Sequence, residues 1–319
     1  MKTDPQKIDS GIFCIKIPQP FYPDTNVYLI EGKELTLVDA GFPRQETVTI
    51  LSDSLKHLGY SLPDLSTIIY THPHVDHLGG GLLINREVEL KHIGYLGQPS
   101  GDEENFESLT DNARKAHLEL GRHVLEGNLP RIGKEEVFNY IEIYFPRVGG
   151  LEGVIDVKDG ETLDLGSDKI NVIYTPGHSS YHICLYEPAR RILFSGDLLI
   201  GRLPPLFNIR DFIKSLTRIS QEEIGLILPG HGPVRKWPEK VIARAEQSVR
   251  GYERKILNAL NGKGHTVMDI VGKTYGRSPE NIIEYFNQTG IVGSFLRMLI
   301  DEGRVSRRES SGKIYYELN

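Results

Sequence analysis

At 319 residues the chain is long enough for one large domain and a small one. With 39% apolar and 25% charged residues it has the composition of an ordinary globular protein, and no apolar run approaches the ~18 residues of a membrane span, so we expect no membrane insertion. The net charge of −6 argues against non-specific nucleic-acid binding, and residues 1–10 lack a secretory signal, so we expect a cytoplasmic protein.

The first third of the chain combines short strands with a helix. Strands rich in Ile, Val, Leu, Tyr and Thr are predicted over residues 11–18, 26–31, 35–39 and 66–71. Between the last two, apolar residues recur at helical spacing and stop before Gly59, which predicts a helix over residues 45–58. This region therefore mixes sheet and helix, as α/β folds do.

The middle of the chain is predicted to hold a helical insert and then more strands. Apolar residues at intervals of three and four predict a pair of helices over residues 102–145. Further strands are predicted over residues 162–165, 169–175, 182–186, 191–195 and 226–228. Cys14 and Cys184 lie in separate strand-like stretches, and we interpret them as buried free thiols.

From Trp237 the pattern changes to helices, so we divide the chain into domains over residues 1–236 and 237–319. Helices are predicted over residues 241–261, 266–275 and 279–303, the last broken near 287–290. Strands over 305–309 and 313–318 follow as a hairpin. Three helices and a hairpin are typical of a winged helix. Its 13 Lys or Arg against 10 Asp or Glu allow nucleic-acid binding, but we favour packing or dimerisation.

A dense set of metal-ligand side chains follows the strand that ends near Tyr70. Within six residues lie His72, His74, Asp76 and His77. His72 and His74 alternate, and Pro73 favours extended geometry before it, so their imidazoles can reach one ion. Asp76 and His77 lie beyond a change of direction and can address a second ion. Imidazole with carboxylate suits zinc, iron or manganese.

Three more such residues occupy turns at the ends of predicted strands. His178 and His231 each follow a Pro-Gly pair, and Asp197 follows a Ser-Gly pair. A lone His is more often a packed structural residue than a ligand. Clustering reverses that expectation, because metal coordination is what these seven side chains have in common. A carboxylate such as Asp197 could bridge two cations and reduce their repulsion.

The order of these motifs resembles the metallo-β-lactamase superfamily. Val38-Asp39-Ala40-Gly41, His-x-His-x-Asp-His, Pro-Gly-His, Gly-Asp and Pro-Gly-His-Gly occur in sequence between Val38 and Gly232. The resemblance implies an αββα sandwich, here an α/β fold with a helical insert and a small C-terminal winged helix. It also implies that His72, His74 and His178 hold one metal, that Asp76, His77 and His231 hold another, and that Asp197 bridges them. Asp39 would orient a ligand.

Within that superfamily the chain is most similar to glyoxalase II-like hydrolases and to lactamase-like endoribonucleases with a winged-helix tail. True β-lactamases fit less well, because they commonly have Cys where Asp197 stands. Two departures from glyoxalases concern substrate recognition. Tyr181 stands where Gly is often found, and the residues after Asp197 lack a Gly-Cys-Gly-Arg sequence. Glutathione is therefore not the expected substrate.

The resemblance implies a dinuclear hydrolase, most favourably with two Zn²⁺, with Fe or Mn as alternatives. Two cations that share a water lower its pKa toward ~7 and supply hydroxide at neutral pH. Asp76 would accept a proton or align the hydroxide, so Asp76 and Asp197 are the candidate catalytic residues. The chain offers no G-x-S-x-G sequence for a covalent mechanism.

Candidate substrate contacts come from three places. By the resemblance, the insert over residues 102–145 would be a substrate lid, and it carries the candidates His117, Arg122, His123 and Tyr144. Tyr181 follows the third motif, and residues 203–207, ending at Phe207, form an apolar stretch that we place at the rim of the site. For each insert residue a surface or packing role is the more common one. His182 lies on a predicted strand and is interpreted as structural.

Three functions remain open from the sequence. The favoured one is hydrolysis of a small thioester or ester, which agrees with the acidic body. The second is a single-strand endoribonuclease or phosphodiesterase, with single-stranded RNA as partner. The third is a mononuclear iron sulfur oxygenase of the same fold. Homodimer formation through the C-terminal segment is compatible with all three.

Overall fold

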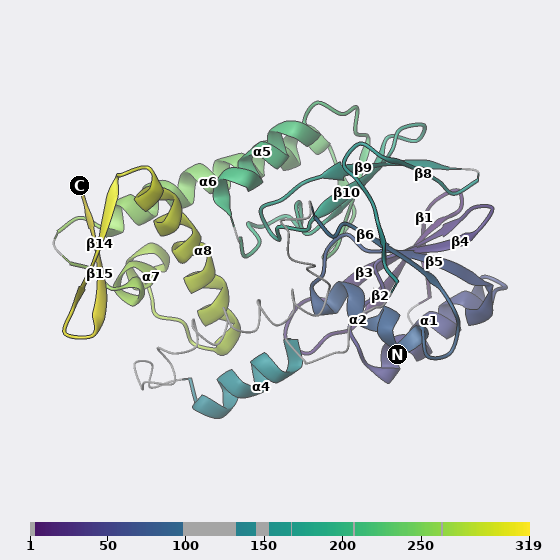
Figure 1. The fold of residues 1–319 in the computed structure, drawn as a ribbon, viewed down its shortest axis with the longest axis horizontal. Coiled ribbons are helices and arrows are strands. Elements are labelled where there is room, and N and C mark those ends of the chain that lie inside the picture. The colour runs from purple at the N-terminus through teal and green to yellow at the C-terminus, as the bar shows by residue number, and fades with distance from the viewer. Residues whose placement is uncertain (1–3, 98–131, 145–152, 167, 207, 263) are drawn as a thin grey trace.

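The computed structural model describes residues 4–97, 132–144 and 153–319, apart from residues 167, 207 and 263 (Figure 1). Of the insert predicted over 102–145, residues 132–144 are described, and α4 (Lys134–Tyr144) occupies most of them. The insert residues His117, Arg122 and His123 lie outside the described residues, as does Phe207.

The first sheet contains seven strands in the described part of the chain, each beside its neighbour in sequence. They are β1 (Gln6–Asp9), β2 (Ile12–Ile17), β3 (Thr25–Glu31), β4 (Leu35–Val38), β5 (Leu65–Ile69), β6 (Lys91–Gly94) and β7 (Ile155–Asp156). Pairing is antiparallel from β1 to β4 and parallel from β4 to β7. The four strands predicted in this region are confirmed, whereas the short β1, β6 and β7 were not predicted.

The second sheet contains six described strands in the spatial order β13-β12-β11-β10-β9-β8. Their bounds are β8 (Thr162–Asp164), β9 (Lys169–Tyr174), β10 (Ile183–Glu187), β11 (Ile192–Gly196), β12 (Leu226–Pro229) and β13 (Arg235–Lys236). Only the β11–β12 pair is parallel among these strands, and α5 (Ile209–Ile219) forms its crossover. All five strands predicted here are confirmed.

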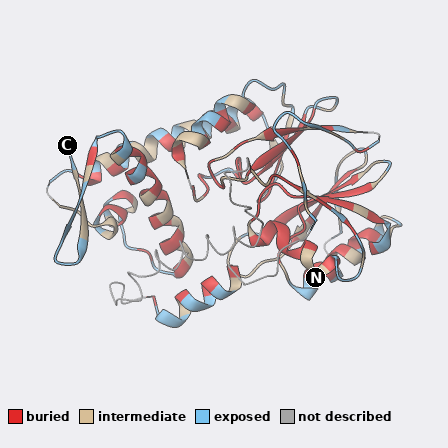
Figure 2. Ribbon diagram, viewed as in Figure 1, coloured by how far each residue is buried: buried red, intermediate tan, exposed pale blue. Residues whose placement is uncertain are grey.

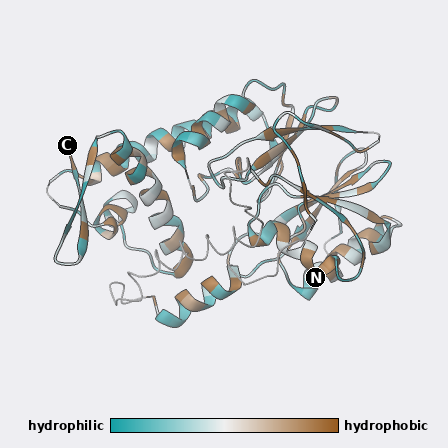
Figure 3. Ribbon diagram, viewed as in Figure 1, coloured by the Kyte–Doolittle hydropathy of each residue, from teal (hydrophilic) through white to brown (hydrophobic). Residues whose placement is uncertain are grey.

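The two sheets pack face to face with helices outside each, which confirms the αββα sandwich. Between the sheets, Ile12, Tyr28 and Ile69 of the first meet Val172 and Phe194 of the second. The other face of the first sheet is covered by α1 (Gln45–His57) and α2 (Val75–Ile84). Figures 2 and 3 show buried and hydrophobic residues concentrated in these sheets.

The start of α2 depends on glycines that permit close backbone approach. A Cβ at Gly80 would lie 1.9 Å from the carbonyl oxygen of Ala40, and one at Gly79 would lie 2.5 Å from Pro43. Both contacts are shorter than any side chain allows, so the glycines let α2 rest directly on the chain after β4. Residues 75–84 were not predicted to be a helix, because glycines lower helix propensity.

The C-terminal segment contains α6 (Pro238–Ala259), α7 (Val267–Tyr275) and α8 (Ile282–Asp301), followed by the hairpin of β14 (Val305–Ser310) and β15 (Lys313–Leu318). The predicted break near residues 287–290 is wrong, because α8 is continuous. Its residues on both sides of Gly290, including Phe286 and Val292, are buried, so packing overrides the weak helix propensity there. Asn281 caps the helix by accepting from the backbone N–H of Glu284.

One hydrophobic core joins the C-terminal helices to the second sheet. Ile173, Leu193 and Ile227 of the sheet share it with Phe212 of α5 and Phe295 of α8. The division at residues 236 and 237 stays a prediction, as does the winged-helix assignment. In the described residues, no helix is both long and apolar enough to span a membrane.

Both cysteines are confirmed as buried free thiols. Burial raises the pKa of Cys14 to about 11 and that of Cys184 to about 12. The reactive thiolate is therefore strongly disfavoured at neutral pH for both residues.

Candidate metal centre

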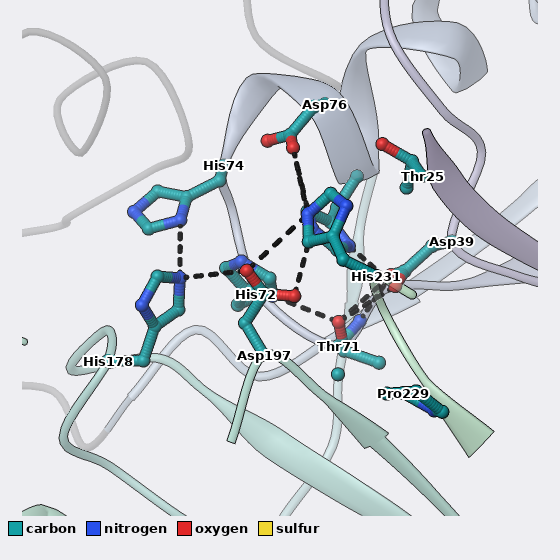
Figure 4. A network of polar contacts seen from close by, with 12 residues as sticks. Thr25, Asp39, Thr71, His72, His74, Asp76, His178, Asp197, Pro229 and His231 are labelled. Atoms are coloured by element: carbon teal, nitrogen blue, oxygen red, sulfur yellow. Dashed lines mark hydrogen bonds and ion pairs between the residues drawn. The ribbon is translucent and has the colours of Figure 1, made fainter. Parts of the chain in front are cut away.

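The seven predicted ligands converge at one end of the two sheets (Figure 4). His72 and His74 lie in the segment between β5 and α2, and Asp76 and His77 occupy the first turn of α2. His178, Asp197 and His231 lie beyond the ends of β9, β11 and β12. The sheets thus bring together residues up to 159 positions apart, from His72 to His231.

The ligand atoms fall into two groups, and Asp197 lies near both. Atoms of His72, His74 and His178, which we call group one, all lie within 4.8 Å of one another. Atoms of Asp76, His77 and His231, which we call group two, satisfy the same limit, and so does a third set formed by His72, His77 and Asp197.

Hydrogen bonds at Nδ1 orient four imidazoles so that Nε2 faces the centre. His77 Nδ1 donates to Asp39 Oδ2 at 2.8 Å, and His178 Nδ1 donates to the Pro205 carbonyl at 2.7 Å. His231 Nδ1 donates to the Asp24 carbonyl at 3.1 Å. His72 Nδ1 lies 2.9 Å from Thr71 Oγ1. An acceptor at Nδ1 places the lone pair of a neutral imidazole on Nε2, as metal binding requires.

In each group, ring nitrogens of two histidines face each other, and a positive charge between them would stabilise their lone pairs. His178 Nε2 lies 2.9 Å from His74 Nδ1, and His77 Nε2 lies 3.3 Å from His231 Nε2. Two ligand atoms on one tetrahedral zinc lie about 3.4 Å apart. The spacing in both groups therefore fits a metal ion, with a proton as the alternative occupant.

Asp197 stands between the groups (Figure 4). Its Oδ2 lies 3.6 Å from His178 Nε2 and 3.5 Å from His231 Nε2, while its Oδ1 lies 3.5 Å from His77 Nε2. Both Asp197 Oδ1 and His72 Nε2 are buried without a hydrogen-bond partner among the described residues. Buried polar atoms in native proteins are normally paired, so these two atoms independently point to a cation.

Group one consists of imidazoles held neutral. Burial, reinforced by His77 and the other nearby imidazoles, holds the pKa of His72 well below its usual 6.5. Burial and the adjacent His178 likewise hold the pKa of His74 well below that value. Burial also lowers the pKa of His178, although Asp197 opposes the shift. Group one therefore offers free lone pairs at neutral pH.

Group two contains the Asp76 carboxylate and has the carboxylates of Asp39 and Asp197 beside it, so it favours a bound positive charge. Burial disfavours the charged form of His77, but Asp39, Asp76 and Asp197 outweigh it and raise the pKa of His77 to about 10. Burial is likewise outweighed at His231, whose pKa is raised by Asp197 and Asp76. Burial opposes ionisation of Asp76, yet His77 and His231 hold the pKa of its carboxyl well below the usual range. A bound cation would replace these protons.

Asp39 lies behind both groups in a strained backbone conformation. Its φ of 61° is left-handed, which is uncommon for a residue other than Gly. Besides His77, its carboxylate accepts hydrogen bonds from the backbone N–H of Thr71 at 2.8 Å and from Thr71 Oγ1 at 2.9 Å. Because Thr71 Oγ1 donates to Asp39, it accepts from His72 Nδ1. Asp39 thus contacts one ligand directly and another through Thr71.

The Pro-Gly-His sequence at the end of β12 needs its glycine, Gly230, for steric reasons. A Cβ at Gly230 would lie 2.5 Å from Asp197 Oδ1 and 2.7 Å from His77 Cε1. Only Gly allows this turn to approach the shared carboxylate so closely.

His182 supports the centre from behind. Its Nε2 accepts a hydrogen bond from the backbone N–H of Asp197 at 3.1 Å, and its Nδ1 lies 2.9 Å from Thr175 Oγ1. Burial lowers the pKa of His182 to about 3, so the ring is neutral and can accept that bond. Both nitrogens of His182 are engaged in this way, which agrees with the structural role interpreted from the sequence.

The described residues that were predicted to contact substrate are buried or half-buried. Tyr144 lies near the centre, but it is buried and its hydroxyl donates to Gln19. Tyr181 is half-buried against the core between the sheets. In the apolar stretch predicted at the rim, Leu203 and Leu206 are buried in the core that includes the C-terminal helices, whereas the Pro205 carbonyl accepts from His178. A rim formed by this stretch stays a prediction.

Two residues near the centre escaped the sequence analysis. Thr71 directly precedes the first ligand motif, so its position was a usable signal. Gln19 donates to Asp76 Oδ2 at 3.1 Å from a Pro-rich segment 57 positions away. No local pattern identifies such a residue.

Comparison with known proteins shows the family of the chain. The family model of the metallo-beta-lactamase superfamily matches residues 23–231. The probable metallo-hydrolase YqjP of Bacillus subtilis is 25% identical over 96% of this chain and 97% of its own length. The human acyl-coenzyme A thioesterase MBLAC2 is 30% identical over 71% of this chain and 80% of its own length.

A solved structure extends the likeness to nearly the whole fold. A metallo-beta-lactamase family protein of Thermus thermophilus superposes with a TM-score of 0.78 at 21% identity, over 98% of this chain and all of the other. That likeness concerns the fold alone. Because the family model covers well over half of the residues, the chain belongs to the metallo-beta-lactamase superfamily and is a metallo-hydrolase.

Proposed function

We propose that the chain binds two divalent metal ions, most favourably zinc, and hydrolyses a small acyl thioester. Group one would hold one ion, group two the other, and Asp197 would bind both. The observation that carries this proposal is the position of Asp197, whose carboxylate lies 3.6 Å from His178 of group one and 3.5 Å from His77 and His231 of group two. Imidazole and carboxylate ligands suit zinc, with iron and manganese as alternatives.

The bound ions would supply a hydroxide nucleophile at neutral pH and a Lewis acid for the carbonyl oxygen. The residues of the chain orient the reaction. Asp197 would reduce the repulsion between the two ions, and His182 accepts a hydrogen bond from the backbone N–H of Asp197. Asp76, as a carboxylate beside His231 at 3.2 Å, is placed to accept a hydrogen bond or a proton from the attacking water. Both buried cysteines have raised pKa values, which agrees with water, not a thiolate, as nucleophile.

The thioester class is supported by the likeness to the human acyl-coenzyme A thioesterase. A thiolate is also a leaving group that a second cation stabilises well. We therefore propose an acyl carried on a thiol as the substrate, with an oxygen ester as a slower one.

The two alternatives have less support. In a winged helix that binds nucleic acid, a late helix enters a groove, but α8 has its apolar residues Phe295 and Leu299 buried in the core shared with the body. A mononuclear iron site would need only one ligand set, whereas Asp76, His77 and His231 complete a second.

The test combines metal analysis with substrate turnover. Purified protein is analysed for zinc, iron and manganese, and it is assayed with acyl-coenzyme A thioesters, an oxygen ester and single-stranded RNA. We expect two metal equivalents and thioester hydrolysis that a chelator abolishes. The surface variant Asp53→Asn serves as a matched control for substitutions of buried aspartates, because Asp53 lies on the exposed side of α1. RNA cleavage without thioester turnover would overturn the substrate assignment.

A further inference from the structure

An aromatic cluster lies beside group two and joins three distant parts of the chain. Phe21 and Tyr22 come from the segment between β2 and β3, Tyr140 and Tyr144 from α4, and Phe286 from α8. The rings of Tyr140 and Tyr144 stack at 5.1 Å between centroids, and those of Tyr140 and Phe286 stack at 4.7 Å. The Tyr22 ring meets Tyr144 edge-on at 5.2 Å. We call these five residues the aromatic cluster.

A chain of hydrogen bonds runs from this cluster to a predicted metal ligand. The backbone N–H of Phe21 donates to the Tyr144 hydroxyl at 3.3 Å, and that hydroxyl donates to Gln19 Oε1 at 2.8 Å. Gln19 Nε2 then donates to Asp76 Oδ2 at 3.1 Å. Burial and the nearby Asp76 raise the pKa of Tyr144, so its hydroxyl stays protonated and remains a donor.

The partners of Gln19 fix the orientation of its amide. Nε2 also lies 2.8 Å from the Pro23 carbonyl, which only accepts, and 3.1 Å from Thr25 Oγ1. A rotated amide would place its oxygen against the Pro23 carbonyl and the Asp76 carboxylate and would lose the bond from Tyr144. The amide therefore presents a donor to Asp76.

Among the hydrogen bonds of the described residues, those that join a predicted ligand to the segment between β2 and β3 involve group two. His231 Nδ1 donates to the Asp24 carbonyl, five residues after Gln19. The group-one anchors lie elsewhere, at Thr71 for His72 and at the Pro205 carbonyl for His178.

We propose that Gln19 and Tyr144 are positioning residues that hold the Asp76 carboxylate in place for the group-two metal ion. This inference rests on the two-ion site of the proposed function and adds to it the part played by α4 and α8. Oδ2 of Asp76 also lies 3.2 Å from His231 Nε2, so the oxygen that faces the group-two ligands is the one that Gln19 contacts. A carboxylate with one oxygen held by a fixed donor keeps its remaining lone pairs directed at the cation. The segment that bears Gln19 packs on α4 through the rings of Phe21 and Tyr22, and Tyr22 also donates to Asn287 of α8. The two helices thus support a ligand through this segment.

The experiment measures the affinity of each ion in the full chain. The variants are Gln19→Met, which keeps the length of the side chain without its hydrogen bonds, and Tyr144→Phe, which removes one hydroxyl. Tyr22→Phe is the matched control, because it removes a hydroxyl of the same cluster that bonds Tyr140 and Asn287 instead of Gln19. Zinc affinities are obtained by competition with a chromogenic chelator, and the visible spectrum of the cobalt-substituted protein reports the ligand geometry.

We expect Gln19→Met to weaken one of the two ions by about 10- to 100-fold, as removal of a ligand's hydrogen-bond partner does. We expect Tyr144→Phe to weaken the same ion by about fivefold, the effect of one neutral hydrogen bond. Tyr22→Phe should leave both affinities unchanged. The cobalt spectrum should change in Gln19→Met and stay unchanged in Tyr22→Phe.

Three outcomes would overturn the inference. Parental affinity of both ions in Gln19→Met would refute it and leave the two-ion proposal standing. Equal losses in Tyr144→Phe and Tyr22→Phe would assign the effect to packing. A parent protein that holds a single ion would refute this inference together with the two-ion site. Unfolding midpoints measured on all the variants separate weakened metal binding from misfolding.

Discussion

Group one and group two are built from the same imidazole ring but differ in charge. Group one contains three histidines whose pKa values are all lowered, and its anchors are the neutral Thr71 and the Pro205 carbonyl. Group two contains the Asp76 carboxylate, and Asp39 stands behind His77, so its imidazoles have raised pKa values. Group one therefore offers lone pairs, whereas group two offers negative charge. Asp197 lies near both groups, and its carboxylate is the negative charge closest to group one, which has no carboxylate of its own.

The most severe way to break this comparison is to remove the shared carboxylate. Asp197→Asn takes negative charge from both groups at once. We expect kcat/KM to fall by about 10³-fold, equivalent to about 4 kcal/mol, with less than two metal equivalents retained. Steady-state kinetics and metal analysis measure both quantities, with Asp53→Asn as control. Full metal content and near-normal turnover in Asp197→Asn would remove the basis for a shared ligand.

The second test separates the groups by pH in the metal-free protein. His72, His74 and His178 have lowered folded pKa values, so the unfolded state binds more protons below pH about 6.5 and stability falls as the pH falls, by up to about 1.4 kcal/mol per pH unit for each ring. His77 has a raised pKa of about 10, so its contribution is present below pH about 6.5 and is lost as the pH rises toward 10.

Chemical unfolding of the chelated protein between pH 5 and 10 measures the loss of stability at acid pH and the loss at alkaline pH. Replacing His77 by Gln should reduce the loss of stability at alkaline pH, to which His231 also contributes. The loss at acid pH should persist, although the charge of His77 is one cause of the lowered pKa of His72. A stability that is independent of pH on both sides would mean that the two groups do not differ in charge as described.

The third test weakens one group more than the other. Asp39→Asn removes the charged acceptor of His77 Nδ1, so we expect the group-two ion to be bound about 10- to 100-fold less tightly. The group-one ion should be affected less, because Asp39 reaches His72 only through Thr71. Chelator competition that resolves two affinities is the measurement. Equal losses at both sites would show that Asp39 serves the groups alike.

The smallest expected effect comes from Thr71→Val, which keeps the shape of the side chain and removes the acceptor of His72 Nδ1. We expect a loss of about 1 kcal/mol, or about fivefold, in the affinity of the group-one ion. The same competition assay measures it. If group two weakens more than group one, Thr71 acts mainly by holding Asp39.

The sequence offers its seven candidate ligands in four short motifs, three of which follow predicted strands closely enough to expect them at the same end of the sheets. The structure brings these side chains together, and their roles as metal ligands stay a prediction. Gln19 could not be found in this way, because its contact with Asp76 depends on how a Pro-rich segment folds across α2 and α4. The continuity of α8 and the burial of Leu203 also depend on packing that no local pattern encodes.

The core shared by the second sheet and the C-terminal helices sets an order for synthesis of the protein. The first sheet is complete, apart from β7, by residue 94, and its covering helices α1 and α2 precede that point. The core on the outer side of the second sheet also includes Phe212 of α5, but it is completed only by Phe295 and Leu299 of α8 and by Val305. A chain emerging from the ribosome therefore exposes apolar residues of this core until α8 has been made, which makes the nascent protein a candidate client for chaperones.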